Sequence, residues 1–304
     1  MAKKPSLRQR YRTSRLIMRQ SFRLLTKRRE LWIFPLASSA SMVVGMAALF
    51  VTMFAAGLGG WAVADSPWFA LATLPVLYPF FVMTTVANAA LAYAADQALS
   101  GRRASRREAW ARAWSRVGTI ARFNLITLVL AGLIQATGNL LGQARLTPGL
   151  GRLLGVLGGF GWAVAAFFVI PIVAIEHESG AILALRKSAG LARTTWGKSI
   201  GGIVTIMLAV FVPLMLIFLG IYALAFGAFV ALSFTMGLDS AAPFIVGGLF
   251  VAVLLLLVLV GGAISSAGQT VYQTALYRFA KTGTISGPFT KATLDEAWAP
   301  YRAV

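Results

Sequence analysis

The sequence predicts an all-α, polytopic transmembrane helix bundle with six spans and three basic amphipathic interfacial helices. Three observations lead to this fold class. Of the 304 residues, 58% are hydrophobic and 12% are charged, about half the charged share that is usual in soluble domains. The apolar residues gather in runs that reach the roughly 20 residues a helix needs to cross a bilayer. The basic residues lie between alternate runs, as the positive-inside rule expects of cytoplasmic segments.

Six apolar runs are long enough to be membrane-crossing helices, and they lack the short alternating pattern of barrel strands. The last two runs exceed one crossing but are too short for two crossings and a turn, so each is interpreted as one helix. The predicted spans are Leu31–Leu58, Trp68–Ala95, Thr119–Leu141, Leu150–Ile175, Ile200–Phe234 and Ala241–Tyr277.

The placement of charge predicts the orientation. In the six-span arrangement, 26 of the 28 Lys and Arg residues fall on one side, and only Arg145 and Arg152 fall on the other. Short loops rich in Lys and Arg stay in the cytoplasm. We therefore expect a multi-pass protein of the cell (inner) membrane with both its N- and C-termini in the cytoplasm.

Three segments on the cytoplasmic side show the pattern of amphipathic helices. The first is the basic segment 1–30. The second opens with a capping box, Ser105 to Glu108, and carries Trp110 and Trp114. The third, about residues 179–196, has one apolar face, formed by Ile182, Leu185, Ala189, Ala192 and Trp196.

The net charge of +19 beside apolar spans favours the membrane, through its anionic lipid headgroups, over nucleic acid as the partner. Simple anchoring of the spans is the other interpretation of the same helices. The candidate headgroup contacts are Arg12, Arg15, Arg19, Arg23, Arg106, Arg107, Arg186, Lys187 and Arg193.

The whole chain, 1–304, is expected to form a single integral membrane domain. Within it one order of elements recurs three times: a basic amphipathic helix, a span outward, a short turn and a span back. The units are 1–97, 98–176 and 177–304. The repeat is one of topology, because residue identity between the units is weak.

Four stretches carry a resemblance that covers most of the chain: Glu30–Leu36, Phe167–Glu176, Ala184–Ser188 with Thr195–Gly197, and Tyr272–Arg278. They resemble an uncharacterised family of prokaryotic multi-spanning proteins, a domain of unknown function. The third is also similar to the membrane domain of some glycerophosphodiester phosphodiesterases. The resemblance implies a six-span inner-membrane protein with no known activity, and the phosphodiesterase chemistry does not carry over because its soluble domain is absent.

Glycines of the fourth span predict close packing. Gly151, Gly155 and Gly159 form two overlapping GxxxG steps, the spacing that lets membrane helices approach each other. We expect this face to pack against a neighbouring helix or a second copy of the chain, so a homo-oligomer or another membrane protein is a possible partner. The alanine-rich stretch Ala87–Ala95 is also expected to pack closely.

The residues that usually carry enzyme chemistry are scarce. The chain has no cysteine and one histidine, His177, between Glu176 and Glu178. Adjacent residues on a helix face different directions, so this trio is interpreted as a solvated helix start. We expect no enzyme, no cofactor and no metal site.

Uncharged polar residues recur at similar depth on three predicted spans, and they leave two functions open. Interhelical hydrogen bonds are one interpretation. A polar cavity is the other, formed by Asn88, Asn124, Ser266, Gln269 and Gln273. The favoured function is a membrane-organising or lipid-interacting protein of unknown biochemical activity, and the alternative is a transporter or channel for a neutral or apolar solute.

Overall fold

The computed structural model describes residues 23–58, 67–103, 105–143, 148–176, 180–196 and 242–282, with scattered positions between 216 and 235. Every regular element among these residues is helical, as the all-α class predicts. The elements are η1 (Arg29–Trp32), α2 (Ile33–Leu58), α3 (Pro67–Leu99), α4 (Arg106–Trp114), α5 (Val117–Gln143), α6 (Pro148–Ala166), α7 (Val169–Ile175), α8 (Ala181–Trp196) and α10 (Ala242–Thr282).

Within the described residues, five helical stretches are long and apolar enough to cross a membrane. They are Arg29–Thr52, Leu74–Leu99, Val117–Ile134, Gly155–Ile175 and Leu255–Thr282. These stretches overlap the first, second, third, fourth and sixth predicted spans. The fifth, Ile200–Phe234, and the basic segment as far as residue 22 lie outside the described residues apart from scattered positions.

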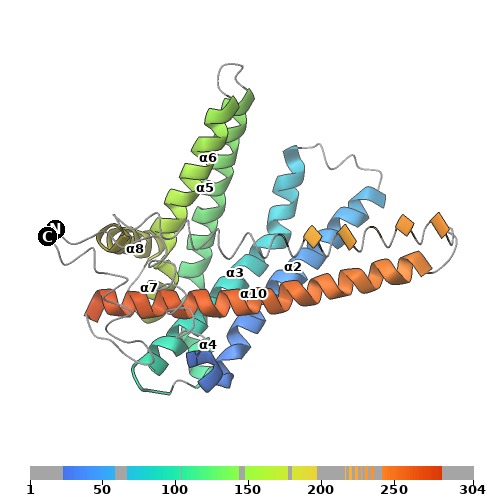
Figure 1. Cartoon of the computed structure of the whole chain (residues 1–304). Coiled ribbons are helices and arrows are strands. Elements are labelled where there is room, and N and C mark those ends of the chain that lie inside the picture. The colour runs from blue at the N-terminus through green and yellow to red at the C-terminus, as the bar shows by residue number, and fades with distance from the viewer. Residues whose placement is uncertain are drawn as a thin grey trace, which may run out of the picture.

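The central element is α3, which contacts α2, α4, α5, α7 and α10. Figure 1 shows α2 and α3 side by side, with α10 running across both, while α5 and α6 form a hairpin that projects from the rest. The sixth predicted span is thus one continuous helix of 41 residues, α10, which is much longer than a single crossing requires.

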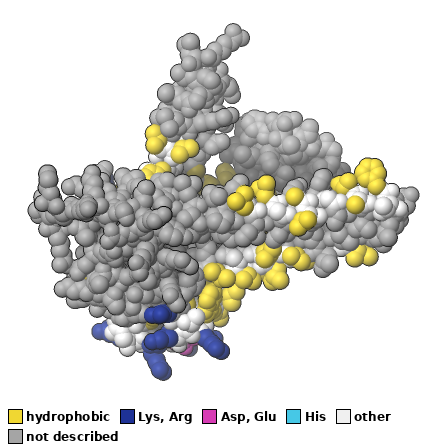
Figure 2. Space-filling model, in the orientation of Figure 1, with side chains coloured by type: hydrophobic (Ala, Val, Ile, Leu, Met, Phe, Trp, Pro, Cys, Tyr) yellow, Lys and Arg dark blue, Asp and Glu magenta, His cyan; other side chains and the backbone are white. Residues whose placement is uncertain are grey.

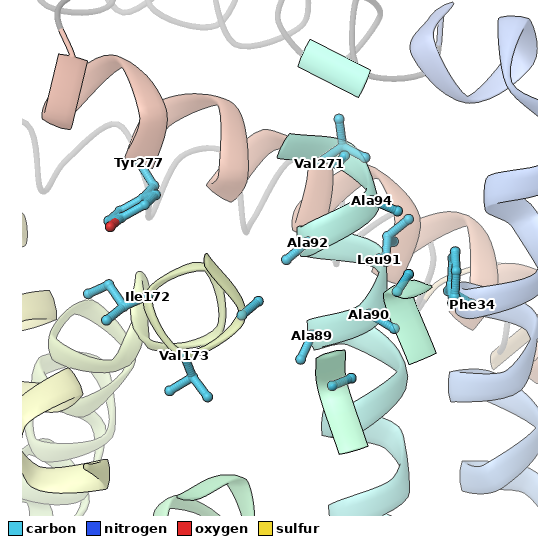
Figure 3. Packing of buried hydrophobic residues seen from close by; sticks show 14 of the residues in the cluster. Phe34, Ala89, Ala90, Leu91, Ala92, Ala94, Ile172, Val173, Val271 and Tyr277 are labelled. Carbon is cyan, nitrogen blue, oxygen red and sulfur yellow. The ribbon is translucent and has the colours of Figure 1, made fainter. Parts of the chain in front are cut away.

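Alanines make α3 narrow enough for so many neighbours. Figure 3 shows Ala89 and Ala92 on the side toward α7, and Ala90 and Leu91 on the side toward Phe34 of α2. These side chains are almost fully buried, as predicted for the Ala87–Ala95 stretch. Small residues favour helix association in lipid because they let backbones approach closely.

The contact between α2 and α3 depends on a glycine. A Cβ atom at Gly45 would lie 2.9 Å from the Phe80 Cβ atom, closer than carbon atoms pack. Beside it, the Ser41 hydroxyl donates to the Phe80 carbonyl at 3.1 Å. The two helices are therefore fixed by shape and by a hydrogen bond at the same level.

Gly45→Ala is expected to lower the free energy of unfolding by about 1–3 kcal/mol, the usual cost of overpacking. Gly155→Ala is the matched control, because a Cβ at Gly155 meets nothing within 4 Å, and it should stay within about 1 kcal/mol of wild type. Titration with a denaturing detergent measures both. Equal effects of the two substitutions would contradict the assigned α2–α3 contact.

The fourth predicted span differs from the expectation of one helix, because it breaks into α6 and α7 at Phe167 and Phe168. The cause is Pro171, whose ring clashes with the carbonyl four residues earlier and which lacks a backbone donor. A backbone donor at the break finds its acceptor outside the span, because the Phe168 N–H donates to the buried Ser188 hydroxyl of α8 at 2.9 Å.

The two described amphipathic helices pack on the bundle through small side chains. Half of the predicted capping box of α4 forms, since the Ser105 hydroxyl accepts from the Glu108 N–H at 3.1 Å. In α8, however, the inward face is Ala181, Ala184, Ser188 and Ala192, while Ile182 is 60% exposed. An exposed Ile182 is compatible with an apolar face turned toward lipid, and the interfacial position of this helix stays a prediction.

The glycine face of α6 is only partly occupied. Gly158 lies against Ile134 of α5, where a Cβ atom on the glycine would be 3.5 Å from that side chain, whereas a Cβ at Gly155 or Gly159 would meet nothing described within 4 Å. Packing of the double GxxxG step against a neighbour or a twin stays a prediction, and its partner is not among the described residues.

Candidate functional site

Charged side chains gather at one end of the bundle, which we call the basic end. It consists of α4 with the preceding turn at Arg102 and Arg103, and of the C-terminal ends of α3, α7 and α10. Figure 2 shows Lys and Arg side chains at the α4 part of this end and hydrophobic side chains along α10.

Glu176 is the most connected acid of the basic end. It caps the C-terminus of α7, and its side chain is 17% exposed. Its Oε2 atom accepts from Lys187 Nζ of α8 at 2.6 Å. Its Oε1 atom accepts from the Tyr277 hydroxyl at 2.6 Å and from Lys281 Nζ at 3.2 Å, both of α10.

These donors keep Glu176 ionised. Burial on its own would raise the pKa of the carboxyl, but hydrogen bonds from Lys187, Tyr277 and Lys281 outweigh it and lower the pKa to about 2. The carboxyl is therefore ionised near neutral pH, and its hydrogen bonds tie α7 to α8 and α10.

Arg112 of α4 fixes the backbone at the same place. Its Nε atom donates to the Ala174 carbonyl at 3.1 Å, and an Nη atom reaches the Ile175 and Glu176 carbonyls at 3.4 and 3.2 Å. The last carbonyls of a helix have no partner within it and carry partial negative charge. Burial and the nearby Arg116 lower the pKa of Arg112 below its ordinary value, yet an arginine stays protonated at that site.

Two further polar links hold α3 at the basic end. Arg278 of α10 donates to Asp96 Oδ1 at 2.9 Å and also to the Ser100 hydroxyl. The Tyr93 hydroxyl donates to Glu108 of α4 at 2.6 Å. The Glu108 carboxylate of the capping box is thus bound to a neighbouring helix, and α3, α4, α7, α8 and α10 all meet at this end.

The candidate headgroup contacts differ in their exposure and in whether the structure describes them. Arg106 and Arg107 are exposed at the start of α4, and Arg186 is exposed on α8. Lys187 is 43% exposed and bound to Glu176, and Arg23 is exposed ahead of η1. Arg12, Arg15, Arg19 and the side chain of Arg193 lie outside the described residues.

The polar positions of the proposed cavity form pairs between helices. The Ser266 hydroxyl donates to Asn88 Oδ1 at 2.6 Å, joining α10 to α3. Asn124 Nδ2 donates to the Thr85 hydroxyl at 3.1 Å, joining α5 to α3. Gln273 is buried, whereas Gln269 is exposed. A cavity built by all five residues stays a prediction.

Sequence reasoning missed the partners of Glu176. Tyr277 and Lys281 follow it by 101 and 105 positions, at and beyond the end of the sixth predicted span. One signal was present in the sequence: Tyr277 and Lys281 are four residues apart, so they share a face of α10. No sequence pattern near Tyr277 and Lys281 indicates that this face contacts Glu176.

Comparison with known proteins finds a family match over most of the chain. The family described as "Family of unknown function (DUF6159)" matches residues 69–287. No curated protein and no solved structure matches the chain. The match agrees with the resemblance to an uncharacterised domain, and it gives no support to the resemblance to the phosphodiesterase membrane domain.

Proposed function

The chain belongs to the DUF6159 family, a family of unknown function, and because that membership brings no activity we propose its role from the basic end of the bundle. The protein is a non-enzymatic, multi-pass protein of the cell inner membrane that binds anionic lipid headgroups and organises the surrounding membrane. The basic end faces the cytoplasm, and residues 200–234 supply a sixth span.

A surplus of exposed positive charge supports headgroup binding most directly. Arg102, Arg103, Arg106 and Arg107 are all exposed, and none pairs with a described acid. The acids of the described residues are already bound, Glu30 to Arg28, Asp96 to Arg278, Glu108 to Tyr93 and Glu176 to its three donors. These four arginines, which we call the arginine surface, therefore present charge that phosphate groups can neutralise.

Exposed apolar side chains support the membrane as the solvent. Phe50 and Val51 of α2 are 69% and 64% exposed, and Val156 of α6 is 69% exposed. Large exposed apolar areas are rare on water-soluble proteins. Lipid chains would cover it without cost.

The test replaces all four residues of the arginine surface by glutamine. Phosphatidylglycerol and phosphatidylcholine are each titrated into the protein in neutral detergent, and bound lipid is counted by native mass spectrometry. Wild type should prefer phosphatidylglycerol. The variant should lose at least about tenfold of that preference, since each basic residue near an anionic surface contributes about 1 kcal/mol.

The matched control replaces the same four arginines by lysine, which keeps the charge and should keep most of the preference. Equal binding of the two lipids by wild type would refute the proposal. A loss in the lysine variant as large as in the glutamine variant would show that charge is not the cause.

A further inference from the structure

We infer that Glu176 is a latch that holds α8 to α10, and that phosphate-bearing anions release it by competing for Lys187 and Lys281. The latch deepens the proposed lipid function and rests on it, because it gives headgroup binding a structural consequence. Two sources share the phosphate chemistry, lipid headgroups at the membrane surface and free phosphate.

Glu176 lies at the junction of two groups of helices. On one side α8 packs against α5, α6 and α7, and on the other α10 packs against α2, α3 and α7. The Glu176 carboxylate receives Lys187 from the first group and Tyr277 with Lys281 from the second. One side chain at the end of α7 thus joins an interfacial helix to a membrane-spanning one.

The bonds of Glu176 differ in how far solvent reaches them. Tyr277 is 1% exposed, so its hydroxyl holds one carboxylate oxygen from inside. Lys187 and Lys281 are 43% and 52% exposed, so both ammonium groups can be approached from outside. A competing anion would therefore remove the two lysines and leave the Tyr277 bond in place.

Charge favours such an anion. Two ammonium groups share one carboxylate, which leaves a net positive charge, and Arg186 is exposed next to Lys187 on α8. Lysine is a common ligand of phosphate, which it binds as a point charge. Protons are a poor release signal, because the groups that face Glu176, namely Lys187, Lys281 and Tyr277, keep its pKa near 2.

Polar bonds add to the apolar packing of α8. Its buried side chains are Ala181, Ala184, Ser188 and Ala192, with Leu185 and Leu191 packed against the core. The Ser188 bond to Phe168 fixes the middle of the helix to the break between α6 and α7. The Lys187 bond fixes α8 to a side chain that α10 also holds.

The experiment measures a distance between α8 and α10. The chain contains no cysteine, so Ile182→Cys and Ile264→Cys, which are at exposed positions, can be spin-labelled without background. Pulsed electron paramagnetic resonance is recorded on the full-length protein in vesicles of phosphatidylcholine alone and of an equal mixture with phosphatidylglycerol. A third sample has phosphatidylcholine vesicles with added inorganic phosphate, matched in ionic strength by chloride.

If Glu176 is a latch, the wild-type protein should show a single narrow distance distribution in neutral vesicles. That narrow peak should be lost in the presence of phosphatidylglycerol, inorganic phosphate or both. The sample in which it is lost identifies the source of the phosphate. Glu176→Gln should lose the narrow peak in every sample and should no longer respond to phosphate. Lys187→Gln, a milder change at an exposed position, should do the same if Glu176→Gln does not fold. Glu30→Gln removes an acid at the same end and should behave as wild type.

Two results would overturn the latch. One is a wild-type distribution that neither source of phosphate changes, and the other is a Lys187→Gln distribution that matches wild type. These results differ from a failure of the proposed function. That failure would be equal binding of phosphatidylglycerol and phosphatidylcholine by the unlabelled wild-type protein in detergent.

Discussion

Replacing Glu176 by glutamine is expected to lower the free energy of unfolding by about 2 kcal/mol near neutral pH. The carboxyl has a pKa of about 2 in the folded protein against an ordinary value of 4.5, a difference that would be worth roughly 3 kcal/mol. Both lysines that contribute are about half exposed, and solvent screening reduces the effect of such pairs. Detergent-induced unfolding of wild type and variant, followed across pH, measures it.

The sign of the pH dependence follows from the lowered pKa. The stabilisation by Glu176 is complete above the ordinary pKa of 4.5 and is lost as pH falls toward 2. The difference between wild type and Glu176→Gln should therefore be constant above about pH 5 and shrink steadily below it. Glu30, 47% exposed and 3.6 Å from Arg28, supplies the control, because Glu30→Gln should change stability by less than about 0.5 kcal/mol. A difference that does not change with pH would contradict the assigned ionisation.

Arg112→Ala is expected to cost about 3 kcal/mol, the largest effect of any single substitution considered for the basic end. The guanidinium donates to three carbonyls at the end of α7, and each charge-assisted hydrogen bond contributes about 1.5–3 kcal/mol before neighbouring groups relax. Its removal leaves helix-terminal carbonyls without their donor. The same unfolding titration measures the loss.

Two other substitutions of α4 separate geometry from charge. Arg112→Lys keeps the charge but not the planar fork of donors, and it should recover less than half of the loss. Arg106→Ala removes an exposed arginine from the same helix and should have little effect on stability. If Arg106→Ala were as damaging as Arg112→Ala, the role assigned to the α7 carbonyls would be wrong.

Features that depend on neighbouring residues could be predicted from the sequence. The spans that the structure describes overlap five of the six predicted ones, because a long apolar run is a local signal with few alternatives. Ser105 caps α4 for the same reason, since the capping pattern occupies four consecutive residues. The burial of the Ala87–Ala95 stretch followed from small side chains alone.

Features that depend on residues far apart in the chain could not be predicted. Glu176 was grouped with its neighbours His177 and Glu178, yet its partners come from α8 and α10. Small residues line the buried side of α8, and nothing in the sequence shows that this side faces protein. The break in the fourth span was not predicted, although Pro171 is a local cause of it, and nothing near Pro171 in the sequence indicates the hydrogen bond between Phe168 and Ser188.

The junction between α6 and α7 imposes an order on biosynthesis. Phe168 leaves the ribosome twenty residues before Ser188, the side chain that accepts its amide hydrogen, so the nascent chain reaches the bilayer with that amide lacking its final acceptor. A free amide in hydrocarbon is costly, and water or the insertion machinery must shelter it in the meantime. Ser188 can accept that amide hydrogen only after α8 has followed it out of the ribosome, so the mature form of the α6–α7 bend depends on a helix outside the fourth predicted span.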